Sequence, residues 1–580
     1  MMVKRDSIPV TVVGEREYSG RNLGPLVLVN PLLERMDIRR IVNLHCPQDP
    51  RLEVSVGDVI YALVANRLCS AEPLVHVAGW AGYSGAEFVL GTAADALNDD
   101  RLARALDRVF PLRWNILADV ALQVCERFGV SLSKLHYDPT SFHFTGQYDE
   151  ESPSPSLLPE LKPFRIEVGR HARPGHHIKE AQVGVNLAND GKGPLPVFYH
   201  SADGSDNGHR AVAKNLQHLL KYLKPKRLLL VTDRGCFCAK HAVAMVRRHH
   251  FDFISSVTWK DEYGQLYETK KPQMQEASFL SLNERRKRET GKSEETWERY
   301  LIGEIPYTIT HEKESIRARM IFVHSSADAK ACRKTRARYT EKIKKGLAEI
   351  QRKVDNGYLK EIRIVHRGVN SLYGSKQAQK YFTYRVEPLT PEEITSLPPR
   401  RPGQRKRTLR FSFQYHPEIA EKDATHDGLY ALLTSLARRQ CSTDEVFTTF
   451  KEQHHIETAH HQWKAPIRLR PVFLKKATRI ESLVFVQFLA LMAFYLLQRL
   501  YRLAEGASCR TTGETLLRQF AFCAIGVRYE DQTIVVSTFP VNHAQAQTLS
   551  TLGFPSLEEQ IRRYLTRRKR PRQEPQDKNI

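Results

Sequence analysis

The sequence predicts an α/β protein in which helical regions precede and follow a sheet with parallel strands. Before residue 131, apolar side chains recur at three-and-four spacing, which is typical of amphipathic helices, most clearly in 58–69, 99–110 and 113–128. Strand-like segments bounded by turn residues follow at 132–144, 181–190 and 195–202. Helix, strand, helix and strand then alternate, and a helix between strands favours a crossover with parallel pairing.

Each later element is predicted from its own pattern. The first three strands suit a meander, and the alternating elements after them lie at 209–223, 228–231, 239–250 and 251–258. From about 260 to 420 the order breaks down into charged runs such as 333–345 and 400–407, with strands at 317–326 and 406–415. Long amphipathic helices return past 440, and the basic, polar tail is expected to be disordered.

These changes predict five segments: a helical N-terminal region, an α/β region, an inserted basic subdomain, a second region with long helices, and a C-terminal region with a basic tail. Their bounds are 1–130, 131–260, 261–420, 421–505 and 506–580. A chain of 580 residues is too long for one hydrophobic core, so several domains are expected.

The composition points to a polyanionic partner. The chain has 88 Lys and Arg against 65 Asp and Glu, a net charge of +23. Its nine cysteines show no paired spacing beyond Cys236-x-Cys238, so a disulfide scaffold or zinc ribbon is not expected. The same pattern predicts a reducing, cytoplasmic location. The apolar run 483–497 contains Gln487 and is shorter than the roughly 18 residues of a spanning helix, so it predicts a buried core helix and no membrane association.

The stretch RLLLVTDRG, Arg227–Gly235, places Asp233 directly after four aliphatic residues. An acid there is often a turn or helix-cap residue. It also stands where α/β proteins bind ligands, at the carboxyl end of a parallel strand. Partners elsewhere in the chain must decide between these interpretations.

Two segments supply such partners. Asp138 lies in the first strand-like segment, and it would meet Asp233 if the first and fourth strands were adjacent. Taken alone, an acid such as Asp138 is more often an ordinary strand or turn residue. Two adjoining carboxylates, however, repel unless a cation such as Mg²⁺ lies between them. In FKEQHHIETAHHQWK, the spacing of three, four and seven puts four side chains on one helical face: Phe450, Gln453, Glu457 and Lys464.

With these motifs the chain resembles the DDE transposases of bacterial insertion sequences, in the group marked by a Tyr-x2-Arg-x3-Glu-x6-Lys signature. The resemblance covers about 5–505 and rests on LHYDPTSFHFTG, VTDRG and the signature spacing of Glu457 and Lys464, supported by LNDDRLARALDRV, DGLYALLTS and LRPVFLKKATRIESLVFVQFLALM. Phe450 replaces the signature Tyr and Gln453 replaces its Arg, which removes a hydroxyl and a charge. His454 or Lys451 would supply the missing donor.

The resemblance implies an RNase H-like catalytic core in two parts, 131–260 and 421–505, that is split by a largely β insertion. It also implies that the helical N-terminal domain, 1–130, binds DNA. Glu457 lies 224 positions after Asp233, which leaves room for such an insertion, whereas Asp233 lies 95 positions after Asp138. It also implies that Asp138, Asp233 and Glu457 hold two Mg²⁺ ions, which Mn²⁺ replaces, and that Lys464, Gln453, Phe450 and His454 contact DNA. The implied partners are double-stranded DNA, as terminal inverted repeats and as target, and a second protomer in the synaptic complex.

The implied reaction is cleavage at the transposon ends, followed by transfer of the 3′ hydroxyl into target DNA. Two alternatives share the fold: an RNase H-like nuclease without strand transfer, and an inactive DNA-binding protein derived from a transposase. A zinc site made by His454, Glu457 and His461 is a further alternative, although it leaves Asp138 and Asp233 without a role.

Three tryptophans, Trp259, Trp297 and Trp463, would either stack on an extruded base or, as is commoner, pack in the core.

Overall fold

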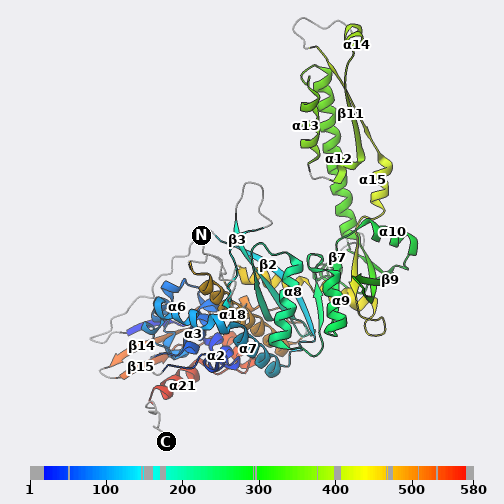
Figure 1. The fold of residues 1–580 in the computed structure, drawn as a ribbon. Coiled ribbons are helices and arrows are strands. Elements are labelled where there is room, and N and C mark those ends of the chain that lie inside the picture. Colours follow the sequence, from blue (N-terminus) through cyan, green and yellow to red (C-terminus); the bar gives the residue numbers. More distant parts are fainter. Residues whose placement is uncertain are drawn as a thin grey trace. The chain divides into compact units, whose positions relative to one another are not determined.

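The computed structural model has helices first, sheets in the middle and helices again towards the end of the chain (Figure 1). It describes residues 18–49, 53–144, 148, 161–169, 178–291, 293, 297–374, 377–397, 406–464, 467, 474–506, 508–530 and 533–569. Most of the basic run 400–407 and the tail from 570 onwards lie outside the described residues, as do 468–473 in the segment that supports the resemblance.

The chain divides into two compact units. Unit 1 comprises Met1–Ser255, Thr310–Ile316 and Phe450–Ile580, and unit 2 comprises Ser256–Ile309 and Arg317–Thr449. The chain therefore leaves unit 1 after Ser255, returns to it for the short segment Thr310–Ile316, and returns again at Phe450, shortly before Glu457. The five segments drawn from the sequence pattern stay a prediction beside this division.

The N-terminal part of unit 1 is helical, as predicted. Its described α-helices are α1 (Leu26–Arg35), α2 (Ile38–His45), α3 (Val56–Cys69), α4 (Val77–Ser84), α5 (Glu87–Leu90), α6 (Asp99–Val109) and α7 (Arg113–Phe128). The side chains of Ser55 and Asn98 accept backbone N–H bonds at the starts of α3 and α6, which satisfies donors that a helix leaves unpaired. The helices expected at 58–69, 99–110 and 113–128 are confirmed.

Unit 1 contains the predicted meander and parallel strands. The strands are β2 (Lys134–Phe144), β3 (Glu167–Val168), β4 (Lys179–Ala188), β5 (Leu195–Ala202), β6 (Leu229–Thr232) and β7 (Asp252–Val257). Antiparallel pairing joins β2 to β4 and β4 to β5, whereas β6 pairs in parallel with both β2 and β7. The connecting helices are α8 (Gly208–His218), which a π-helical turn continues, and α9 (Ala239–Arg248). The first and fourth predicted strands are therefore adjacent.

The apolar run 483–497 lies within α18 (Ala477–Glu505). One described helix, α18, is long and apolar enough to cross a membrane, and its apolar window is completely buried inside the protein. It packs against α3, α6 and β5. Burial on all sides explains why this helix is apolar all round, and the prediction of a core helix is confirmed.

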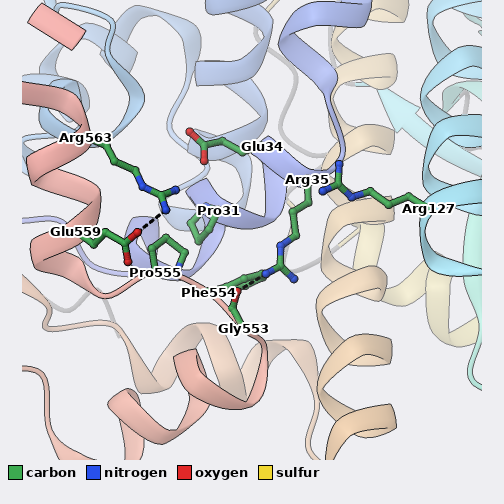
Figure 2. A pocket seen from close by; sticks show the side chains of 9 residues that line it. All are labelled: Pro31, Glu34, Arg35, Arg127, Gly553, Phe554, Pro555, Glu559 and Arg563. Atoms are coloured by element: carbon green, nitrogen blue, oxygen red, sulfur yellow. Dashed lines mark hydrogen bonds and ion pairs between the residues drawn. The ribbon is translucent and has the colours of Figure 1, made fainter. Parts of the chain in front are cut away.

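The two ends of the described chain fold together. The C-terminal elements are α19 (Gly513–Gln519), β14 (Ala524–Glu530), β15 (Thr533–Thr538), α20 (His543–Thr551) and α21 (Leu557–Lys569), and β1 (Tyr18–Asn22) pairs antiparallel with β14. Arg35 donates to the carbonyl oxygens of Leu552 and Gly553 and lies over the ring of Phe554. A cavity of about 460 Å³ at this junction is lined by charged side chains from both ends, and it includes none of the predicted site residues (Figure 2).

The described part of unit 2 combines four strands with a subdomain of helices and a two-stranded sheet. The strands are β8 (Gln275–Glu276), β9 (Tyr300–His311), β10 (Glu314–Ser325) and β13 (Leu429–Thr434), and β10 pairs antiparallel with β13. The helices before β9 are α10 (Asp261–Lys270) and α11 (Leu282–Glu289). The subdomain contains α12 (Ser326–Asp355), α13 (Ile362–Tyr373), β11 (Phe382–Pro388), α14 (Pro391–Ser396), β12 (Leu409–Tyr415) and α15 (Pro417–Ala424). The strands expected at 317–326 and 406–415 are confirmed as β10 and β12.

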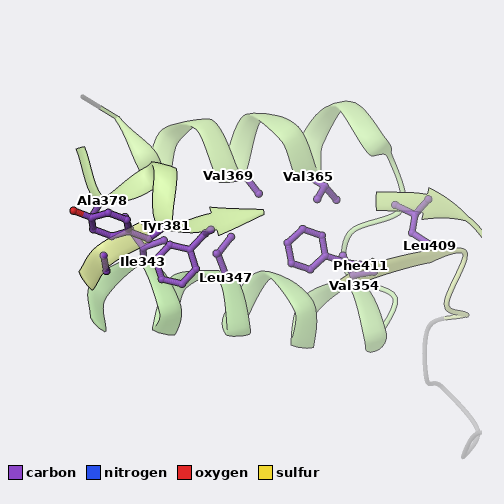
Figure 3. Close-up of a cluster of buried hydrophobic side chains, with 11 residues drawn as sticks. Ile343, Leu347, Val354, Val365, Val369, Ala378, Tyr381, Leu409 and Phe411 are labelled. Carbon is purple, nitrogen blue, oxygen red and sulfur yellow. The ribbon is translucent and has the colours of Figure 1, made fainter. Parts of the chain in front are cut away.

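The expectation of a largely β insertion is wrong for the described residues, because helices outweigh strands between 261 and 420. The 30-residue helix α12 accounts for much of the difference. Its buried Ile343, Leu347 and Val354 pack with Val365 and Phe411, and Figure 3 shows the labelled side chains of α12 and α13 pointing towards each other. This core forms because apolar residues stand at helical spacing among the many charged residues of α12.

Candidate active site

Asp138 and Asp233 follow equivalent positions on neighbouring parallel strands. Tyr137 on β2 is in register with Thr232, the last residue of β6, and each acid is the next residue in the chain. Tyr137 and Thr232 are both buried, whereas Asp233 is exposed. Asp233 also accepts a hydrogen bond from the backbone N–H of Arg234 at 2.6 Å, as the cap of a short 3₁₀ turn. The cap interpretation and the juxtaposition of two acids therefore both hold.

Glu457 and Lys464 lie on the helix that packs against β2. This helix, α17 (His454–Lys464), buries Ile456, Ala459 and Trp463 and leaves Glu457 exposed. Lys464 Nζ donates to Thr140 Oγ1 at 2.5 Å, two residues after Asp138 on β2. This hydrogen bond holds Lys464, the predicted cation, close to Asp138, the predicted acid.

The electrostatics of Asp138 connect all four predicted catalytic residues. Burial, together with the negative charges of Asp233 and Glu457, raises the pKa of Asp138 from 3.8 to about 7, and Lys464 acts in the opposite direction. A carboxyl whose ionisation is opposed by two other carboxylates favours a cation among them. All three donors are hard oxygen atoms, the ligands that Mg²⁺ prefers, so this donor set fits the ions implied by the resemblance.

The described side chains do not converge into a closed metal cage. Within the described ranges, no three His, Cys, Asp or Glu side chains lie close enough together to hold a metal ion. The alternative zinc group, His454, Glu457 and His461, is included in that statement, and all three are exposed on α17. The charges of Asp233 and Glu457 therefore act on Asp138, but the described side chains of the three acids do not form a metal-binding group.

The shifted pKa of Asp138 predicts an unusual dependence of stability on pH. Because its folded-state pKa is raised, the folded protein is favoured below pH 3.8, and this contribution is lost as the pH rises through about 7. Without divalent cations, Asp138→Asn is therefore expected to have a free energy of unfolding above that of the wild type at pH 8, by on the order of 1–3 kcal/mol. At pH 4 the two proteins should have nearly the same free energy of unfolding. Thermal melting of both proteins at the two pH values measures this. Added Mg²⁺ should raise the melting temperature of the wild type at pH 8 more than that of the variant, and a variant less stable at pH 8 would contradict the expectation.

The single helix predicted over 450–464 is wrong. Helix α16 (Thr443–Lys451) ends before Glu452, and α17 begins at His454. Glu452 lies 2.9 Å from Lys134 Nζ, and Gln453 exchanges hydrogen bonds with β2. These bonds hold the intervening turn against the strand, and periodicity alone does not reveal them.

Gln453, at the position of the signature Arg, is used inside the protein. Its Oε1 accepts from His136 Nδ1 at 3.0 Å, its Nε2 donates to the carbonyl oxygen of Tyr137 at 3.0 Å, and only 9% of the residue is exposed. In this conformation its amide is engaged by the residues directly before Asp138 and is turned away from solvent. Phe450 is half-buried in the last turn of α16, and His454 is exposed. The roles of these three residues in DNA contact stay predictions.

Sequence reasoning missed three neighbours of the acids. His460 is buried with Nδ1 3.7 Å from Asp138 Oδ2, and burial, with the charge of Lys464, lowers its pKa to about 3, so its ring is neutral. Cys236 is buried, and burial with the charges of Asp138 and Asp233 raises the pKa of its thiol. Gly208 packs so closely on the turn after Asp233 that a Cβ there would collide with the carbonyl of Gly235. For His460, the available signal in the sequence was its position three residues after Glu457, which puts both on one side of a helix.

The tryptophans take core or surface packing positions. Trp463 is fully buried against Tyr199 and Phe488, so its core interpretation is confirmed. Trp259 packs with Phe322 and other rings of unit 2, and Trp297 lies under the guanidinium of Arg288.

The N-terminal part of the chain is similar to a known protein family. A family model described as a domain of unknown function, DUF4277, matches residues 18–120. No curated protein matches the chain. The matched segment covers β1, α1–α6 and the start of α7, and it contains none of the candidate site residues.

Proposed function

We propose that this protein is a DNA transposase of the DDE class, with an RNase H-like catalytic centre in unit 1. The observation that carries the proposal is the parallel register of β2 and β6, which brings Asp138 and Asp233 to adjoining strands beside Glu457 and Lys464. The resemblance supplies the class of reaction, and the net charge of +23 suits a DNA substrate.

In this proposal the carboxylates of Asp138, Asp233 and Glu457 would hold two Mg²⁺ ions. When bound, the ions supply charge neutralisation and Lewis-acid activation at the scissile phosphodiester. Thr140 holds the ammonium of Lys464 beside Asp138, where it would bind a phosphate oxygen of the DNA backbone. The bonds of Gln453 to β2 keep α17, and with it Glu457, in place against the strand of Asp138.

The reaction has two displacements at phosphorus. Water first attacks the phosphodiester at the element's end, the 3′ oxygen leaves as a free hydroxyl, and the phosphate stays on the 5′ side. That hydroxyl then attacks a phosphodiester of the target DNA, and a target 3′ oxygen leaves. No nucleotide cofactor is needed, because the second step replaces one phosphodiester by another.

The decisive experiment uses the DNA that flanks the gene. Short inverted repeats on both sides would define the element's ends, and a labelled duplex carrying one such end is incubated with full-length protein in Mg²⁺, Mn²⁺ or EDTA. We expect nicking at the end and joined products in either metal ion and neither in EDTA, from complexes that hold at least two protomers. Nicking without joining would favour the nuclease, and binding without nicking would favour the inactive DNA-binding protein.

A further inference from the structure

The two sides of α12 have opposite character. Buried Ile343, Leu347 and Val354, spaced by four and seven, lie on the side that packs against α13 and β12 (Figure 3). Five cations spaced by four, four, seven and seven follow the other side of the helix: Lys330, Lys334, Arg338, Lys345 and Arg352. The helix thus has one apolar side and one cationic side along most of its length.

The cationic side is poorly neutralised by the protein itself. Nine Lys and Arg of α12 are exposed, against three exposed acids, Asp328, Glu341 and Glu349. Among the described residues, the exposed cations with a recorded ion pair are Lys345 with Glu341 and Lys353 with Glu349. Lys330, Lys334 and Arg338 are successive like charges four residues apart, an arrangement that destabilises an isolated helix.

We infer that this side of α12 binds the phosphate backbone of duplex DNA. The inference rests on the proposed function for the choice of DNA as the polyanion. From Lys330 to Arg352 the row of cations extends about 33 Å at 1.5 Å per residue, close to one turn of the duplex at about 34 Å. A rigid helix anchored by its apolar side presents these charges together, and binding would release the counterions that they and the phosphates hold.

The contact is one of affinity and position, since it uses charge and reads no base edges. The proposed centre in unit 1 acts on one phosphodiester, so α12 adds a separate contact surface on unit 2. Duplex binding through α12 therefore does not depend on a metal ion, and it can be measured apart from cleavage.

The test compares two full-length triple variants with the wild type on a 30-base-pair duplex of arbitrary sequence, in EDTA, between 50 and 200 mM salt. One carries K330Q, K334Q and R338Q; the control carries K221Q, K226Q and R227Q, which are exposed in unit 1 near the start of β6. Glutamine keeps helix propensity close to that of Lys and Arg, and thermal melting checks folding. For the α12 variant we expect a log–log salt slope less steep by about 2.7 and affinity at 100 mM lower by roughly 10- to 100-fold, with little change in the control.

An unchanged slope, or an equal change in the control, would overturn the inference. So would a variant that keeps duplex affinity and loses binding to single-stranded RNA or to anionic phosphatidylserine vesicles instead. The proposed function fails separately: a wild type that never nicks an element end leaves the duplex measurement valid. Conversely, if the protein cuts normally while α12 contributes nothing to binding, the proposed function stands and the inference about α12 fails.

Discussion

Replacing Asp233 by serine is expected to abolish DNA cleavage, by a factor of at least about 10³, in a protein that stays folded. Asp233 has two roles in the structure, as cap of the turn Arg234–Cys236 and as neighbour of Asp138. Serine is a good capping residue, so it keeps the turn while it removes the charged ligand. Cleavage assays and thermal melting on the same preparation separate the two roles.

The other acids should behave alike. Asp138→Asn and Glu457→Gln are expected to lose cleavage to a similar extent, because groups that act as one unit lose activity together and not additively. Thr458→Ala is a matched control, since Thr458 is exposed on α17 beside Glu457. If folded Asp233→Ser still nicks the element end, Asp233 is an ordinary cap. Glu457→Asp should recover partly in Mn²⁺.

Replacing Glu481 by alanine is expected to destabilise the protein by about 3–5 kcal/mol. Glu481 on α18 and Arg113 on α7 form an ion pair at 2.9 Å, with 0% and 2% of their side chains exposed. Glu481 Oε2 also accepts from the backbone N–H of Phe164 at 3.0 Å, and Ser201 donates to Oε1. Without Glu481, the Arg113 guanidinium stays buried without its counter-charge, which costs far more than the loss of one surface ion pair.

Denaturant unfolding with two controls tests this explanation. Glu514→Ala breaks the exposed pair of Arg518 and Glu514 and should change stability little. The double variant Arg113→Met with Glu481→Leu removes both charges and should be more stable than Glu481→Ala alone, since no isolated charge remains. A double variant as unstable as the single one would show that packing, and not the unpaired charge, dominates.

The sequence by itself determined the local elements and the main catalytic candidates. Alternating strands and helices predicted the meander and the parallel pairing, because these follow from periodicity and from the geometry of crossovers. The adjacency of β2 and β6 was a condition that the structure met. An acid inside the first strand, Asp138, and an acid directly after the fourth, Asp233, were thereby candidate neighbours. The apolar run 483–497 predicted a core helix, but the helix that contains it is long enough to cross a membrane, and its burial is seen only in the packing.

Only the tertiary structure decided how the remaining side chains are used. The break between α16 and α17, and the burial of Gln453, depend on bonds to β2 more than 300 residues away in sequence, which no local pattern contains. The same holds for His460 beside Asp138 and for β1, whose partner β14 lies at the other end of the chain. Periodicity reports which side of a helix or strand is apolar. Which polar groups meet across that side is decided by packing, because a hydrogen bond or ion pair forms only when the fold brings both partners within about 3 Å.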